Sequence, residues 1–249
     1  MKAKIMSLED NNQEHIVRSY SEELNLLTAT VVRMGGITES QLNLSIKAIE
    51  NLDVSKADLA IKSDLELDNF EKEIEGLVTR LFVLRQPMAV DLRNVMAALK
   101  ISSDLERIGD YAKNIAIRSK SITDDKILPI MEGLVSMGTL ASECLRNVLD
   151  GYQALDSEAA LEAWRKDEEI DKLYTNVFVE IVNFMEKNSG SVNSGTHMAF
   201  IGKNIERIGD LTTNIAEEIY FMVRGERLTD DRPKADKTAT ITSNEVIND

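Results

Sequence analysis

The sequence is poor in cysteine, proline, aromatic residues and basic charge, and each shortage excludes a class of protein. With Cys144 as its only cysteine, the chain has no intrachain disulfide and no cysteine-based zinc site. Three prolines, twelve glycines and few aromatic residues in 249 positions do not supply the turns that an all-β fold needs. The composition therefore favours an all-helical fold.

Basic residues are outnumbered, and long apolar runs are missing. The 43 acidic and 29 basic residues give a net charge of −14, which argues against binding nucleic acid through its phosphates. The first residues lack the apolar region of a signal peptide, and no apolar run approaches the length of a membrane span. No phosphate-binding glycine loop, Ser/His/Asp order or nucleotide fingerprint is present. We therefore expect a soluble, cytoplasmic, non-catalytic protein.

What the sequence does contain is one stretch twice. Residues 105–116 read LERIGDYAKNIA and residues 205–216 read IERIGDLTTNIA, with eight of the twelve positions identical. Upstream, the repeat continues at a separation of 103 residues, as between Asp53 and Asp156. Apolar packing alone would not keep the polar identities of the motif, so we expect the function to involve them. The repeat predicts two copies of a three-helix unit, each packed as an antiparallel bundle.

Apolar spacing and turn signals place the helices of the first unit. A first helix is expected over about 15–53, with a weak point at Gly35-Gly36 because glycine costs about 1 kcal/mol in a helix interior. A capping box of Ser55 and Asp58 would start the second helix. Pro87 suits the first turn of the third helix.

The second unit repeats this order after a polar connection. The clearest loop of the chain is predicted over 188–195, and Gly225 is expected to end the last helix as a C-terminal cap. We therefore predict a first bundle over 14–121 and a second over 125–225. The segment 226–249, called the tail below, is polar and acidic without apolar periodicity, so it is predicted to be disordered.

Pairs of carboxylates four residues apart recur on the predicted helices. Residues at this spacing share a helix face, with Cβ atoms roughly 6 Å from each other, so paired carboxylates repel unless a cation lies between them. Oxygen ligands of this kind suit magnesium, calcium, manganese or iron. The candidate metal ligands are Asp64, Asp68, Glu106, Asp110, Asp167, Asp171, Glu206 and Asp210.

The same spacing is also typical of a solvated helix face, and both interpretations stay open at this point. At about 100° per residue, Glu206 and Asp210 point roughly 160° away from the apolar stripe of their helix, which predicts an outer surface. The Glu-x-x-His pair of a di-iron bundle is missing.

Two further identities of the repeated motif need a reason. Gly109 and Gly209 lie mid-helix despite the cost of glycine there, which predicts the close approach of another group at both positions. Arg107 and Arg207 are expected to pair with a neighbouring carboxylate or with a partner.

The doubled ERIGD, each time followed by NIA, resembles the PhoU family of phosphate-uptake regulators. The resemblance also rests on LRQP at 84–87, on AALKISSDLERIGD and on GTHMAFIGKNIERIGD, and it covers about residues 14–226. It implies two three-helix bundles in tandem. It also implies surface clusters of iron, manganese, magnesium or zinc on the eight carboxylates named above. Members often carry histidine after the ERIGD aspartate, where this chain has Tyr111 and Leu211.

The resemblance implies a function as well. Members of the family restrain phosphate-starvation genes when phosphate is plentiful, and they link the ATPase subunit of the phosphate ABC transporter to a membrane sensor histidine kinase. By this resemblance the chain is a negative regulator that binds those two partners, meets a membrane only through them and forms a homodimer. Two alternatives stay open: a carboxylate-bridged metalloenzyme, and a metal-free helical adaptor whose acidic faces only maintain solubility.

Overall fold

The computed structural model describes residues 2–122, 127–230, 232 and 234–240, with side chains from residue 18 onward except at 128 and 129. Six α-helices make up most of this part of the chain, and it contains no strand. The predicted all-α class is confirmed. None of these helices combines the length and the apolar character that crossing a membrane requires.

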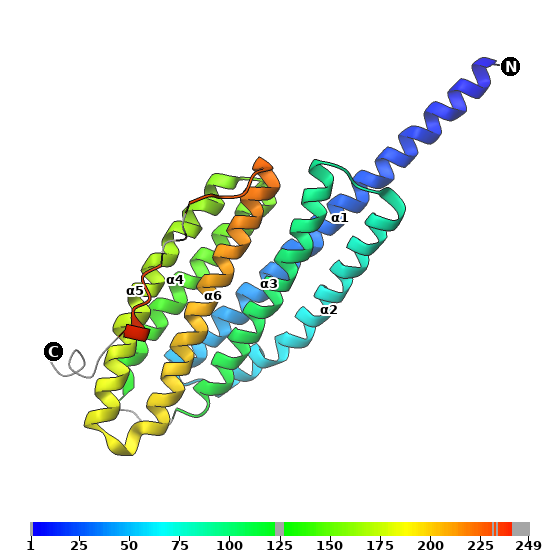
Figure 1. Cartoon of the computed structure of the whole chain (residues 1–249). Coiled ribbons are helices and arrows are strands. Elements are labelled where there is room, and N and C mark those ends of the chain that lie inside the picture. The colour runs from blue at the N-terminus through cyan, green and yellow to red at the C-terminus, as the bar shows by residue number, and fades with distance from the viewer. Residues whose placement is uncertain (1, 123–126, 231, 233, 241–249) are drawn as a thin grey trace.

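The helices follow one another in two groups of three. The first group is α1 (Lys2–Glu50), α2 (Val54–Arg85) and α3 (Val90–Ser119). The second is α4 (Leu128–Ala154), α5 (Ser157–Lys187) and α6 (Val192–Arg224), with short 3₁₀ helices at Ser189–Ser191 and Thr238–Thr240. Figure 1 shows the two three-helix bundles side by side, with the N-terminal part of α1 extending beyond them. Contacts of α3 with α6, and of α1 with α4, join the bundles.

A continuous apolar core runs through both bundles, and two glycines allow the bundles to approach each other. A Cβ on Gly35 would lie 2.3 Å from Leu149 Cδ2, and a Cβ on the equivalent Gly138 would lie 2.9 Å from Ile46 Cγ1. The expected weak point at Gly35 is therefore not a break, since α1 is unbroken there. Packing between α1 and α4 offsets the cost of glycine inside a helix.

A repeated aspartate caps the second helix of each bundle. The Asp53 carboxylate accepts hydrogen bonds from the backbone N–H groups of Ser55 and Lys56. The predicted capping box of Ser55 with Asp58 is therefore wrong. Asp156 caps α5 in the same way, with its carboxylate on two backbone N–H groups. The recurrence of this aspartate between the repeats is explained by its role as N-cap.

Other helix ends differ from the predictions in smaller ways. The first helix begins at Lys2, well before the expected start, and α3 begins only after Pro87, which lies outside its first turn. The second-bundle loop is shorter than the predicted 188–195, because α6 already starts within that range. Gly225 ends α6 in the left-handed conformation, with φ of 78°, so the predicted cap is confirmed.

The tail follows a defined path, in contrast to the predicted disorder. After the left-handed Gly225, its described residues run back along α5 and α6 (Figure 1). The backbone N–H of Lys237, for example, donates to Thr175 Oγ1 of α5 at 3.2 Å. The remainder of the tail, 241–249, lies outside the described residues.

Candidate functional site

The eight predicted metal ligands lie on two faces, one in each bundle. The first acidic face lies on α2 and α3 and consists of Asp64, Asp68, Glu106 and Asp110. The second acidic face lies on α5 and α6 and consists of Asp167, Asp171, Glu206 and Asp210. In both faces, carboxylates of different helices are close enough to repel one another.

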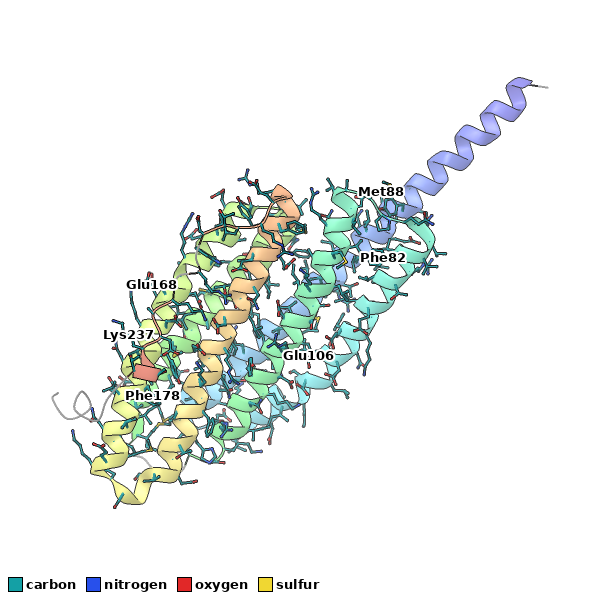
Figure 2. The ribbon with its side chains drawn as sticks, viewed as in Figure 1. Phe82, Met88, Glu106, Glu168, Phe178 and Lys237 are labelled. Carbon is teal, nitrogen blue, oxygen red and sulfur yellow. The ribbon has the colours of Figure 1, made fainter. Side chains whose placement is uncertain are left out.

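The first acidic face is short of positive charge. Lys113 contacts it, with Nζ 2.5 Å from Asp64 Oδ2 and 3.6 Å from Asp110 Oδ1. Asp110 is exposed, and Figure 2 shows Glu106 on the side of α3 that faces α2. Burial raises the pKa of Glu106 to about 6, and repulsion from Asp110 and the nearby carboxylates adds to this rise. An added cation would therefore relieve repulsion on this face.

The second acidic face is buried. Asp167, Asp171 and Glu206 are only 2%, 3% and 5% exposed. The predicted outer surface is wrong for this bundle, because the returning tail covers the face. Angles around one helix cannot reveal a cover that is supplied by a later segment of the chain.

Two cations of the tail bind Asp210. Arg232 Nη2 donates to the Asp210 backbone oxygen at 2.6 Å and to Asn214 Oδ1 at 3.0 Å. Lys234 Nζ lies 3.1 Å from Asp210 Oδ1. Sequence reasoning missed both cations, since a segment without periodicity gives no register against the helices. The one signal in the sequence is that Arg232 and Lys234 lie close together, between Asp231 and Asp236.

Asp171 and Glu206 have contacts of different origin, from the tail and from α6 respectively. The backbone N–H groups of Ala235 and Asp236 donate to Asp171 Oδ2 at 2.7 and 3.2 Å. Lys203 Nζ lies 2.9 Å from Glu206 Oε2 as an ion pair, and this oxygen has no hydrogen-bond partner among the described residues. Burial raises the pKa of Glu206, and Lys203 counteracts that rise. Fixed N–H donors and a lysine thus take the positions that solvent or a cation would otherwise hold.

Asp167 is the least satisfied member of the second acidic face. Its Oδ2 atom is buried and has no hydrogen-bond partner in the described part of the chain. Burial raises the pKa of Asp167 to about 7, and repulsion from Asp171 and Asp210 contributes. An isolated buried carboxylate is costly when it is ionised. Asp167 therefore destabilises the bundle at neutral and alkaline pH.

Both mid-helix glycines of the repeated motif allow close contact between helices. A Cβ on Gly109 would lie 2.3 Å from Leu67 Cδ1, and a Cβ on Gly209 would lie 2.8 Å from Asp167 Oδ1. The predicted close approach is confirmed at both positions. The nearest atom differs, however: it belongs to an apolar side chain in the first bundle, with Gln41 Oε1 next at 2.9 Å, and to a carboxylate in the second.

The two faces differ in how well they suit a metal ion. In neither face, as far as the structure describes the chain, do three or more His, Cys, Asp or Glu side chains converge as metal ligands would. The first face offers hard oxygen donors with uncompensated repulsion, which suits a magnesium, manganese or iron ion. On the second face, Arg232, Lys234 and two backbone N–H groups already bind the carboxylates.

The two arginines of the repeated motif lie between the bundles. Arg107 Nη1 is 3.8 Å from Asp104 Oδ1, which is a long version of the expected ion pair. The Arg207 guanidinium lies 5.7 Å from the ring centroid of Tyr111, a residue of the first bundle. This cation–π contact between bundles is not visible in the sequence.

Comparison with known proteins decides the family. A family model described as the PhoU domain matches the chain twice, at 31–118 and at 134–219. The chain belongs to the PhoU family. The two matched stretches fall on the two bundles, so the tandem repeat predicted from the doubled motif is confirmed.

Relatives in the PhoU family share most of the chain. A protein of Caulobacter vibrioides described as "phosphate-specific transport system accessory protein PhoU homolog" is 47% identical over 224 residues, covering 90% of this chain and 97% of its own. A protein of Xylella fastidiosa with the same description is 39% identical over 227 residues, covering 91% and 96%.

Two crystal structures show the same fold. PhoU from Pseudomonas aeruginosa superposes with a TM-score of 0.79 at 27% identity, covering 83% of this chain and all of that one. The phosphate transport system regulatory protein PhoU from Streptococcus pneumoniae gives 0.77 at 28% identity, covering 84% and 99%. The architecture described above is therefore that of the family.

Proposed function

We propose that this protein is an accessory regulator of a phosphate-specific transport system. The doubled PhoU domain carries the proposal, because relatives named as accessory proteins of such a system share it over nearly their whole length. The protein acts in the cytoplasm as a non-catalytic adaptor between the ATPase of the phosphate transporter and a sensor histidine kinase. In phosphate-rich conditions it restrains phosphate uptake and the phosphate-starvation response. Such an adaptor needs surfaces that bind its partners differently in two states.

One end of the first bundle supports a role in protein binding. Around the turn between α2 and α3, Val83 is 69% and Met88 80% exposed, and Leu84 and Val90 are exposed beside them. Figure 2 shows Met88 at this end of the molecule. The corresponding turn of the second bundle, 188–191, is polar. A group of exposed apolar side chains typically marks a contact with another protein.

We also propose that the first acidic face binds a divalent cation, while the second remains free of metal as long as the tail covers it. Repulsion around Glu106 supports the first part, and the tail cations on Asp210 support the second. A metal-free adaptor is the alternative that the second face favours.

A reporter of a phosphate-starvation gene in phosphate-rich medium tests the regulatory proposal. We expect deletion of the protein to switch the reporter on and the wild-type gene to silence it again. The variant V83S/L84S/M88S, which removes the exposed apolar side chains, should fail to silence it at equal protein level. The matched control L59S/L65S removes two exposed leucines elsewhere on α2 and should silence it fully.

Each result has a definite meaning. A silent reporter in the deletion strain, with no second copy of the gene, would contradict the regulatory proposal. If the reporter is active with both serine variants, the role of the α2–α3 end is contradicted, while the regulatory proposal itself stands. The variant E106A/D110A/E206A/D210A, in the same strain, tests whether the carboxylates take part in signalling.

A further inference from the structure

A polar pocket of about 420 Å³ opens where the two bundles meet, at the contact between α3 and α6. Its basic lining comes from three parts of the chain: Arg107 of α3, Arg207 of α6 and Arg232 of the tail. Arg107 and Arg207 are equivalent positions of the repeated motif. The doubling that places carboxylates on two separate faces thus brings these two arginines to one pocket. Neither the proposed partners nor the proposed cation site explains this convergence.

The charges of Arg107 and Arg207 are poorly compensated. Arg107 has the ion pair with Asp104, which at 3.8 Å is too long for a hydrogen bond. Of the described residues, no carboxylate lies within the 4.0 Å of an ion pair from Arg207, which rests near the ring of Tyr111. Both arginines are exposed, so their N–H groups can bind an anion that arrives from solvent.

The acidic side chain that lines the pocket is already paired. The Asp210 carboxylate lies 3.1 Å from Lys234 Nζ and 3.4 Å from Arg232 Nη1. Arg232 Nε is buried, has no hydrogen-bond partner in the described residues and lies 3.9 Å from Glu217 Oε1. With Lys234 neutralising Asp210, the guanidinium groups leave the pocket positive.

We propose that this arginine pocket binds a small phosphate-bearing anion. A guanidinium presents parallel N–H groups that match two oxygens of a phosphate, and Arg107 and Arg207 supply them from the two bundles. Asn214 adds a donor, because its oxygen accepts from Arg232 and its amide nitrogen is left to donate. The pocket is large enough for more than one phosphate group, so it admits inorganic phosphate or the phosphates of a nucleotide. This site is separate from the partner contacts proposed above.

Calorimetric titration of the full chain tests the site. EDTA first removes divalent cations, since a metal on the acidic faces could hold phosphate indirectly. Inorganic phosphate and ADP are then titrated separately at constant ionic strength. We expect R107Q/R207Q to weaken binding by about tenfold or more, because two charged hydrogen-bonding groups are lost. The variant R107K/R207K keeps the charges without the forked donors, so its affinity should lie between those of R107Q/R207Q and the wild type.

A matched control makes the result specific. The variant R33Q/R165Q also removes two exposed arginines, and Arg33 lies 5.0 Å from the Phe70 ring centroid much as Arg207 lies over Tyr111. The affinity of this control for both anions should be within about twofold of the wild type, because the substitutions lie on the surface away from the site. If the glutamine variant loses its helical circular dichroism, R107K/R207K carries the comparison instead.

The outcomes separate the sources of the phosphate. If ADP binds more tightly than phosphate and this binding is lost in R107Q/R207Q, the site is supported and its ligand is a nucleotide. If phosphate binds at least as tightly as ADP, the ligand is the free anion. Absence of saturable binding of both anions to the wild type overturns the proposal. Equal weakening in R33Q/R165Q and R107Q/R207Q overturns it as well, since binding would then follow net charge and not the pocket.

Discussion

The two acidic faces have the same carboxylate spacing and different surroundings. In the first bundle, Lys113 lies among the carboxylates, and Asp110 remains exposed. In the second bundle, Thr213 stands at the position of Lys113 and its hydroxyl donates to a backbone oxygen, so it adds no charge. There the positive charge is supplied by Lys203 of α6 and by the tail instead.

This difference shows that the repeated motif sets where the carboxylates lie, while neighbouring segments set what they can bind. Burial raises the pKa of Glu106 to about 6 and that of Asp167 to about 7. Solvent reaches the first face and can be replaced there by a cation. On the second face, groups of the chain itself already hold the carboxylates, so an added ion would have to displace them.

Reversing the two tail cations tests the cover of the second face and should have the largest effect. In R232E/K234E, new carboxylates would face Asp210, and charged hydrogen bonds worth about 1.5–3 kcal/mol each would be lost. We expect the tail to detach. Hydrogen exchange followed by mass spectrometry should show protection of the tail amides falling by about 100-fold or more. The control R165E/K172E reverses two exposed charges of α5 and should keep the tail protected. Full protection in R232E/K234E would contradict the cover.

Equivalent aspartates of the two faces should respond oppositely to amide substitution. The folded-state pKa of Asp167, about 7, lies above its usual 3.8, so the folded chain holds a proton that the unfolded chain releases between these values. Wild-type stability therefore falls as pH rises from about 4 to about 7, by about 1.4 kcal/mol per unit of pKa difference. D167N lacks this loss and should be more stable than wild type by roughly 2–4 kcal/mol at pH 8 and about equal at pH 4.

Urea unfolding across this pH range checks the comparison. D64N, at the equivalent position, loses the contact with Lys113 and should be less stable by about 1 kcal/mol or less at pH 8. A D167N variant that is less stable than wild type at pH 8 would show that other groups of the folded chain compensate the Asp167 charge.

Divalent cations should distinguish the two faces, because they should stabilise only those variants whose first acidic face is intact. At 100 times its Kd, a cation that binds only the folded state adds about 2.7 kcal/mol to the free energy of unfolding. With Mn²⁺ as the probe, we expect a rise in Tm for the wild type and for E206Q/D210N. The rise should be largely absent in E106Q/D110N. Equal responses of both variants would remove the distinction between the faces, and no response of the wild type would favour the metal-free adaptor.

The sequence predicts the helices well, because their order is encoded locally. Apolar periodicity fixes the stripes, and glycines at equivalent positions report the close approach of helices. Helix ends are less certain: Asp53, Ser55 and Asp58 all suit a cap, and only the backbone geometry selects Asp53. The same ambiguity makes the predicted start of α3 about one turn too early, since Pro87 lies before the first helical residue, Val90.

The acidic faces could be predicted as residue sets but not as environments. The four-residue spacing identifies all eight carboxylates. It does not reveal that Asp171 accepts two N–H groups from Ala235 and Asp236, more than sixty residues later. Such a contact depends on the path of a segment that has no apolar period, and composition alone made that segment look disordered.

The smallest expected effect concerns Lys113, whose removal should lower the stability of the metal-free protein and increase its affinity for Mn²⁺. K113Q removes a partly exposed ion pair, so it should lower stability by about 0.5–1 kcal/mol at low salt and by less at high salt. The matched control K120Q breaks a slightly longer, more exposed pair with Asp58, at 2.7 Å and away from the motif, and should lower stability by a similar or smaller amount. Only K113Q, however, frees Asp64 and Asp110 as ligands. It should therefore bind Mn²⁺ more tightly than wild type while being less stable without it, whereas K120Q should leave Mn²⁺ binding unchanged. If both variants bind Mn²⁺ more tightly, the cause is the change in net charge. If neither does, Lys113 does not compete with a cation on the first face.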